Sequence, residues 1–330
     1  MMETRYLGLT LPHPFMVGAS PLVDNLAVVR ALEDAGTAAI VMHSLYEEQL
    51  TGESMAASRH LDQPAESVAE ATSYLPELPD FALGPDEYLE QIFQIREAVA
   101  VPVIGSLNGV TPGGWLEYAR LIEEAGASAL EVNLYGVPTD PLAMGWDIEE
   151  RAIEVVRLVT SSVKIPVAVK LSPFYSALAH FASRLEAAGA GGMVLFNRFY
   201  QADIDTESLD VRPALALSRP DELLLRLRWL AILSGQTRAS LAVSGGVHSG
   251  LDAVKAVMAG ADVVQVVSAV LKHGPKRLAE IRFEFEQWVE AHEYESLAQL
   301  RGSMNLKRCP DPQAFERASY LRVLQGWRAE

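Results

Sequence analysis

Three polar side chains end apolar segments and belong to types that bind a flat ligand. Lys170 ends the segment VAVK, Asn133 ends EVN and Asn197 ends LFN. A fixed ammonium group can stabilise negative charge that develops on a ligand, although a surface lysine and a Schiff-base lysine are alternatives. An asparagine offers a carbonyl and an amide, so two of them suit a planar hydrogen-bonding molecule. The alternative for each asparagine is a loop cap.

Two turns late in the chain indicate a phosphate site. Gly245 and Gly246 end one apolar segment, and Val267 and Ser268 end the next, ahead of a helix expected to begin near His273. Backbone N–H groups in such turns bind phosphate together with a helix N-terminus, and glycine lets the backbone approach the ligand. A tight turn without a ligand is the alternative.

Other features narrow the class of protein. His43 also follows an apolar segment, where it could contact a ligand, transfer a proton or be an ordinary core histidine. The single cysteine, Cys309, excludes an internal disulfide and a multi-cysteine cluster within this chain. Zinc-protease, nucleophile-elbow and Walker motifs are absent from the sequence. The formal charge of −16 disfavours nucleic acids and anionic membranes as partners.

The elements that must position these residues alternate between strand and helix. Eight apolar segments of strand length are apolar at nearly every position, which is typical of parallel strands buried on both faces. They are Pro14–Ala19, Ala38–Ser44, Val101–Leu107, Ser128–Leu134, Ile165–Leu171, Gly191–Phe196, Ser240–Ser244 and Asp262–Val267. Between them, apolar residues recur at helical spacing. The predicted helices are Asn25–Ala35, Trp115–Ala125, Ile148–Thr160, Ala177–Ala188, Leu251–Met258 and Arg277–Glu290.

A weak internal repeat supports this alternation. Four times an acidic or alanine-rich helix end is followed by a glycine and then by a strand, which predicts left-handed helix caps at Gly36, Gly126, Gly189 and Gly260. Eight strand–helix units predict a closed (β/α)8 TIM barrel, with an open doubly wound sheet as the alternative. We expect one domain over residues 1–330 of the 330-residue chain.

Two long segments and the N-terminus add further expectations. Leu45–Gly84 and Arg198–Pro220 follow strands and exceed ordinary loop length, so they are candidates for function. Met1–Phe15 has no apolar run like that of an export signal, and the sequence has no apolar stretch long enough to span a bilayer. We therefore expect a cytoplasmic protein.

The chain resembles a known family over about residues 5 to 305. The segment LAVSGGVHSGLDAVKAVMAGADVVQVVSAVLKHGP, residues 241 to 275, is similar to the Gly-Gly-Ile … Asp-Ala … Ala-Gly-Ala … Gln-Val … Gly-Pro segment of the dihydroorotate dehydrogenases. PFMVGAS resembles their first strand, and VAVKLSPF, LFNRF and EVNLYGVP resemble their flavin-lysine and asparagine motifs. These enzymes of pyrimidine biosynthesis are FMN-containing (β/α)8 barrels.

The resemblance implies roles for individual residues. Lys170 would face N1 and C2 of the flavin ring. Residues lining the cofactor would be Ala19, Ser20, Ser44, Asn133 and Phe196 at the ring, and Gly245, Gly246, Val267 and Ser268 at the phosphate. The substrate side would hold His43, Asp80, Asn133, Asn197 and Arg198. A small planar or cyclic substrate and a homodimer are expected by analogy with the family.

The sequence departs from the family where the substrate reacts. The family's Cys or Ser base aligns with Gly136, or with Val137 if the prolines are aligned, and neither accepts a proton. His43 replaces a lysine, Asp80 replaces an asparagine, and Val267 replaces a phosphate-loop glycine. The flavin half of the site therefore looks kept while the dihydroorotate half looks altered, with His43 or Tyr135 as a substitute base.

Three other interpretations stay open. A flavin-free barrel could bind a phosphorylated substrate as an aldolase or isomerase. A non-catalytic relative could serve as a partner subunit, and a flavin-bearing one could pass electrons within a complex.

Overall fold

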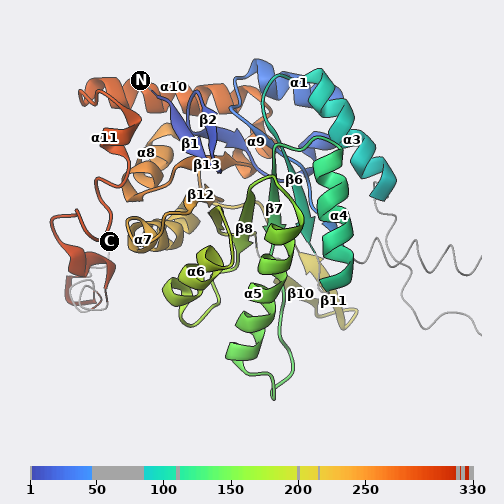
Figure 1. The fold of residues 1–330 in the computed structure, drawn as a ribbon. Coiled ribbons are helices and arrows are strands. Elements are labelled where there is room, and N and C mark those ends of the chain that lie inside the picture. Colours follow the sequence, from blue (N-terminus) through green and yellow to red (C-terminus); the bar gives the residue numbers. More distant parts are fainter. Residues whose placement is uncertain are drawn as a thin grey trace, which may run out of the picture.

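The structure is a computed structural model that describes residues 2–46, 85–108, 112–198, 201–214, 216–316, 320 and 324–326. Its centre is a closed barrel of eight parallel strands (Figure 1). The strands are β3 (Phe15–Val17), β4 (Ile40–Val41), β6 (Val103–Asn108), β7 (Ala129–Asn133), β8 (Val167–Leu171), β9 (Gly192–Leu195), β12 (Ser240–Ser244) and β13 (Val263–Val266). The ring closes because β3 pairs with both β13 and β4, and β4 pairs with β6. All eight predicted strands and the barrel are confirmed.

The second predicted strand is shorter than expected. Only Ile40 and Val41 form β4, and the ladder resumes at β5 (Leu45–Tyr46), which also pairs with β6. The residues between them include His43 and Ser44, so two candidate site residues lie where the strand pairing is interrupted.

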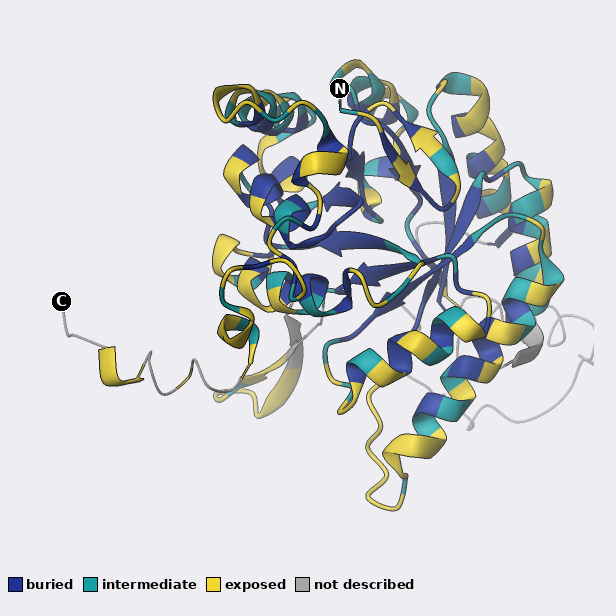
Figure 2. Cartoon of the chain, turned by 60° about the vertical axis from the view of Figure 1, so that its left-hand side comes forward, coloured by how far each residue is buried: buried dark blue, intermediate teal, exposed yellow. Residues whose placement is uncertain are grey.

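Both faces of the strands are buried, because one faces the barrel interior and the other faces the helices (Figure 2). The interior contains small and branched residues such as Ala129, Ala168, Val194 and Ala242. A hairpin that the sequence did not predict, β1 (Thr4–Tyr6) and β2 (Leu9–Leu11), packs against this interior. Its Leu7 N–H donates to Ser240 Oγ at the start of β12, so the hairpin covers the amino ends of the strands. The carboxyl ends are left for the site.

Helices surround the barrel. They are α1 (Leu26–Asp34), α3 (Pro85–Ala98), α4 (Pro112–Glu124), α5 (Gly145–Ser162), α6 (Leu178–Ala187), α7 (Leu223–Leu233), α8 (Gly250–Ala259), α9 (Ser268–His273), α10 (Lys276–Ala291) and α11 (Leu297–Leu300). Short 3₁₀ turns are η1 (Pro21–Asp24), η2 (Pro220–Glu222) and η3 (Pro312–Phe315). The six predicted helices are confirmed, and the four predicted cap glycines have φ between +79° and +126°.

Some helices were not predicted. The α7 sequence, LLLRLRWLAIL, is apolar on nearly every side and so shows no polar face. The α3 segment does place Tyr88, Ile92 and Ile95 at helical spacing on its buried side. The helix expected near His273 begins at Lys276, and the short α9 precedes it.

The two long segments differ in what the structure describes. Residues 201–214 form an antiparallel hairpin of β10 (Gln201–Asp205) and β11 (Asp210–Ala214), which the sequence did not predict. Most of the other segment, including Asp80, lies outside the described residues. Within the described part of the chain, no helix is both long enough and apolar enough to cross a membrane.

Candidate active site

The two predicted asparagines meet at the carboxyl ends of the strands. The Asn197 side-chain amide donates to Asn133 Oδ1 at 3.0 Å, although 64 positions separate the two residues. Asn133 is buried and lies beside Lys170 in the pairing of β7 with β8. The sequence prediction that these three side chains share one end of the barrel is therefore consistent with the structure.

Lys170 belongs to a buried polar chain inside the barrel. Its Nζ donates to Glu131 Oε1 at 3.0 Å, and Gln265 Nε2 donates to Glu131 Oε2 at 2.7 Å. Lys170 is 4% exposed, Glu131 1% and Gln265 0%. Sequence reasoning missed Glu131 and Gln265. A charged residue inside the apolar strand sequence ALEVN was the available signal for Glu131.

His43 lies against a carboxylate. Its Nδ1 is 2.8 Å from Asp24 Oδ1, and its ring meets Tyr88 edge-on with centroids 5.1 Å apart. Burial lowers the pKa of His43 below its usual 6.5, and the neighbouring Asp24 opposes that shift. A neutral imidazole oriented by a carboxylate is able to accept a proton. Sequence reasoning identified His43 and missed Asp24.

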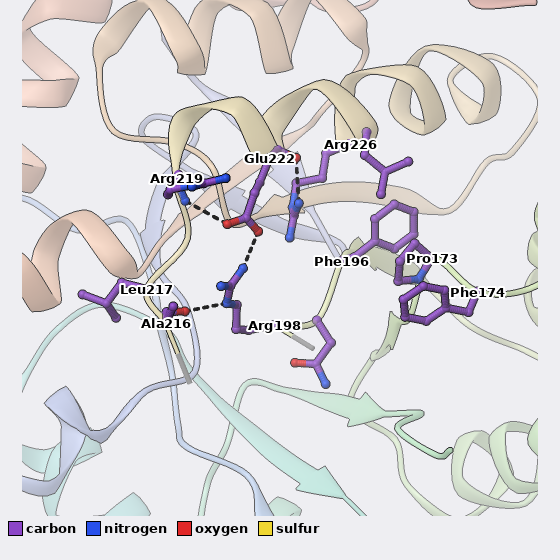
Figure 3. Close-up of a pocket in the computed structure, with 11 residues that line it drawn as sticks. Pro173, Phe174, Phe196, Arg198, Ala216, Leu217, Arg219, Glu222 and Arg226 are labelled. Carbon is purple, nitrogen blue, oxygen red and sulfur yellow. Dashed lines mark hydrogen bonds and ion pairs between the residues drawn. The ribbon is translucent and has the colours of Figure 1, made fainter. Parts of the chain in front are cut away.

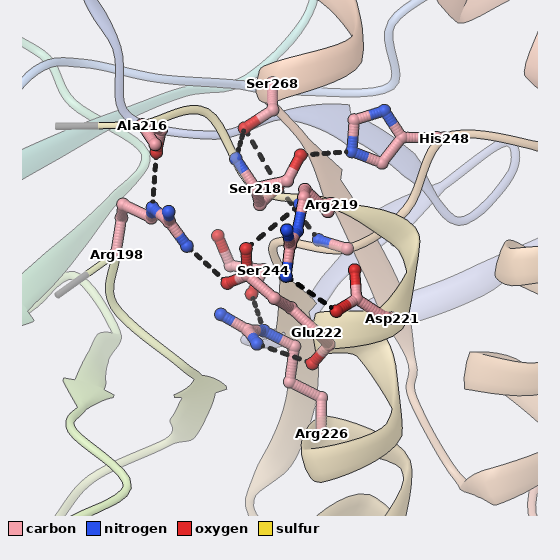
Figure 4. Close-up of polar contacts among 11 residues, drawn as sticks. Arg198, Ala216, Ser218, Arg219, Asp221, Glu222, Arg226, Ser244, His248 and Ser268 are labelled. Carbon is pink, nitrogen blue, oxygen red and sulfur yellow. Dashed lines mark hydrogen bonds and ion pairs between the residues drawn. The ribbon is translucent and has the colours of Figure 1, made fainter.

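The predicted phosphate turns converge on a serine that sequence reasoning missed (Figure 4). Ser218 Oγ accepts from Gly246 N–H at 3.1 Å and donates to Ser268 Oγ at 2.9 Å. His248 Nε2 lies 2.7 Å from the Ser218 carbonyl oxygen. Gly245 and Gly246 have φ of +86° and +83°, which favour glycine. The Ser218 hydroxyl oxygen is therefore bonded to the polar groups of both turns, the Gly246 N–H and the Ser268 hydroxyl.

A pocket of about 520 Å³ opens beside this turn (Figure 3). It is lined by Pro173, Phe174, Phe196, Asn197, Arg198, Ala216, Leu217, Arg219, Glu222, Leu225 and Arg226. Arg198 pairs with the Glu222 carboxylate, and its Nε donates to the Ala216 carbonyl at 2.8 Å. Arg226 donates to the carbonyl oxygens of Ser244 and Glu222.

Arg219, Glu222 and Arg226 were not among the predicted site residues. Arg219 and Glu222 lie at the η2 turn and Arg226 in α7, the elements that the apolar spacing did not reveal.

The remaining predicted residues are placed less uniformly. Ser20 is buried, and its Oγ has no hydrogen-bond partner among the described residues. Ser44 Oγ lies 2.8 Å from Ser106 Oγ. Phe196 is buried, while Ala19 and Val267 are half-buried. Tyr135 is half-buried beside Asn133, whose carbonyl accepts from Tyr135 N–H at 3.0 Å.

The aligned base positions carry no titratable side chain. Gly136 is exposed, with open space where a Cβ would stand, and Val137 is 61% exposed. Cys309 follows α11 in the sequence. It is buried, and its Sγ lies 3.9 Å from the Leu306 carbonyl oxygen.

Comparison with known proteins agrees with this architecture. A family model described as "Dihydroorotate dehydrogenase" matches residues 1–289. A "Putative dihydroorotate dehydrogenase A (fumarate)" of Aeropyrum pernix is 34% identical over 66% of this chain and 72% of its own. A "Dihydroorotate dehydrogenase B (NAD(+)), catalytic subunit" of Thermoplasma volcanium is 26% identical over 91% of this chain and 97% of its own. One of the same name from Geobacter sp. (strain M21) is 34% identical over 68% of this chain and 75% of its own. With a match over most of its length, the chain belongs to the dihydroorotate dehydrogenase family.

Proposed function

We propose that this protein is an FMN-dependent oxidoreductase that acts on a CH–CH bond of a small planar or cyclic molecule at the carboxyl ends of the barrel strands. The observation that carries the proposal is the position of Lys170 next to Asn133 in the strand pairing, with Asn133 bonded to Asn197 at that end of the barrel, in a chain of this family. A buried ammonium group and two amides suit a flat, electron-accepting, hydrogen-bonding ring.

The residues present fit a flavin. Ser20 Oγ is a buried hydroxyl without a partner among the described residues, as expected of a group that binds a ligand. The Gly246 N–H and the Ser268 hydroxyl converge on Ser218 Oγ, so a phosphate oxygen at that turn would find the same groups.

The other cofactor residues keep the roles expected for them. Lys170 would hold the N1 and C2 edge of the ring, and Gly245 would contribute a backbone N–H to the phosphate. Ala19, Ser44, Phe196 and Val267 would line the cofactor. The bound flavin would supply the acceptor for a hydride removed from the substrate.

Proton removal falls to another group, because Gly136 and Val137 offer none. We assign it to His43, whose Nδ1 lies 2.8 Å from Asp24 and whose pKa is lowered by burial, so the imidazole is neutral at pH 7. Asp24 is a positioning residue that fixes the ring. Tyr135 is the second candidate, since its backbone bonds to Asn133.

The substrate is expected to differ from dihydroorotate. The family's base is missing from its usual position, and loss of a general base costs roughly 10²–10⁴-fold in rate, so turnover of dihydroorotate at the family's usual rate is not expected. The names of the relatives mention fumarate and NAD(+), and we propose no acceptor for this chain. The homodimer and the cytoplasmic location stay predictions.

The visible spectrum of the purified protein tests this function. We expect flavin absorption that dithionite bleaches and dihydroorotate does not. Bleaching by both would show that a dihydroorotate dehydrogenase base exists elsewhere. A colourless protein that FMN cannot reconstitute would refute the flavin function and favour a phosphate-binding barrel or a non-catalytic partner subunit.

A further inference from the structure

The pocket beside the barrel mouth has features that the flavin and the proton acceptor do not use. It lies between the end of β9, residues 216–222 and the first turns of α7 (Figure 3). Asn197 lines it and also bonds to Asn133, so the pocket adjoins the proposed reaction site. Its volume of about 520 Å³ falls in the range of small-molecule sites.

The side chains that line the pocket carry a net positive charge, whereas the whole chain is negatively charged. The sequence carries a formal charge of −16, yet the lining holds three arginines and one glutamate. Glu222 pairs with Arg198, and the exposed Arg219 pairs with Asp221 at 3.0 Å. Arg226 is left without a carboxylate partner among the described residues.

Arg226 is the group that points to a ligand. It is 5% exposed, and its guanidinium donates to two main-chain carbonyls, those of Ser244 and Glu222. Burial lowers its pKa, Glu222 raises it, and the nearby Arg198 lowers it again. A buried cation is costly unless an anion compensates it, so an anion bound in this pocket would stabilise the cluster.

The Glu222 carboxylate already behaves as an internal anion. It is held by the Arg198 side chain and accepts from the Arg219 backbone N–H at 3.0 Å. Of the three guanidinium groups at the pocket, the Glu222 carboxylate pairs only with that of Arg198, while Arg219 pairs with Asp221 and Arg226 donates to main-chain carbonyls (Figure 4). An external anion would compete with Glu222 for the same donors.

The rest of the lining is apolar. Pro173, Phe174, Phe196, Leu217 and Leu225 form this part, and Phe174 is 70% exposed. An inorganic ion would leave these surfaces in water. A molecule with a flat apolar body and an anionic end would cover them while its charge meets the arginines.

We propose that this pocket binds the carboxylate or phosphate end of an amphipathic organic anion, with Arg198 and Arg226 as the counter-charges and Glu222 as a competing internal anion. Calling this molecule the substrate rests on the proposed function. The same chemistry could come from the phosphate of the flavin itself, so the test must separate these two sources.

Calorimetric titration with phenyl phosphate provides the test, on the protein as purified and again after its flavin has been removed. We expect binding in both forms. Arg198→Gln should weaken it at least about tenfold, as loss of a charge-assisted hydrogen bond does. Glu222→Gln should tighten it, because the internal competitor loses its charge. Arg228→Gln is the matched control, since Arg228 is exposed on α7, the helix that also carries Arg226, and does not line the pocket.

Opposite effects of two neighbouring substitutions would not arise from a structural role alone. Equal affinities in all variants, or an equal loss in Arg228→Gln, would overturn the proposal. Binding that disappears when flavin is bound would assign the pocket to the flavin and overturn the substrate assignment. A protein without flavin would refute the proposed function, while the effects of Arg198→Gln and Glu222→Gln would still decide whether the anion site exists.

Discussion

Replacing Glu131 by glutamine should destabilise the barrel strongly. The Glu131 carboxylate is 1% exposed, lies 3.0 Å from Lys170 Nζ and accepts a second hydrogen bond of 2.7 Å from Gln265. The substitution keeps the shape of the side chain but leaves the Lys170 ammonium buried without a counter-charge. Breaking a buried ion pair in this way costs about 3–5 kcal/mol.

The size of the thermal shift follows from the length of the chain. An unfolding entropy of about 2.1 cal/mol/K per residue, applied to 330 residues, gives about 0.7 kcal/mol/K. A loss of about 3–5 kcal/mol therefore lowers Tm by about 4–7 °C. Differential scanning calorimetry of flavin-free protein measures this shift without any contribution from bound cofactor.

The partner substitution makes the test specific to the pair. Lys170→Met alone should lower the free energy of unfolding by a similar amount, because it leaves the Glu131 carboxylate buried without a counter-charge. The double variant, Glu131→Gln with Lys170→Met, has no buried charge left at this pair and should be more stable than the sum of the two losses predicts. A Tm within about 1 °C of the parent for Glu131→Gln, or strictly additive losses, would refute the ion-pair reasoning.

Three other perturbations have defined outcomes. Gly246→Ala should lower stability and flavin retention, because φ is +83° and a Cβ would lie 2.6 Å from the Leu223 nitrogen. Gly136→Ala is the control, since the space around Gly136 is open. Equal stability and equal flavin retention in the two variants would contradict this steric reasoning. NMR titration of Asp24→Asn should show the His43 pKa falling further, since Asp24 raises it; an unchanged or higher pKa would contradict the contact. Burial lowers the pKa of His13 from 6.5 to about 4, so the unfolded state binds its proton first and stability should fall by up to about 3 kcal/mol as the pH drops from about 7 to 4. Denaturant unfolding should show a flatter pH profile in His13→Gln, and an unchanged slope would exclude His13 as the cause.

The order of elements could be read from the sequence because it depends on local patterns. Strands buried on both faces are apolar at nearly every position, and four of the predicted βα units end in a glycine, such as Gly126, with a positive φ. Lys170, Asn133 and Asn197 were identifiable because they are polar residues that end apolar runs. In a parallel barrel the carboxyl ends of all strands lie at the same end of the barrel, so the position of these three residues at strand ends was enough to predict that they lie near one another.

What the sequence could not decide depends on side chains far apart in the chain. Glu131 and Gln265 are 134 positions apart, and only closure of the barrel puts them in contact across its interior. Ser218 joins the phosphate turn because residues 216–222 fold back over Gly246.

The anion pocket is likewise a product of the tertiary structure. From the sequence, Arg226 would be taken for a surface residue of an apolar helix. In the structure it is buried, because the first turn of α7 lies against the end of β12 and Arg226 donates to the Ser244 carbonyl. The sequence by itself determined the barrel and the polar end where a ligand would bind, since hydrophobic period and turn chemistry act locally. The tertiary structure alone decided which charges meet there, since hydrogen bonds and ion pairs depend on distances that only the packed chain defines.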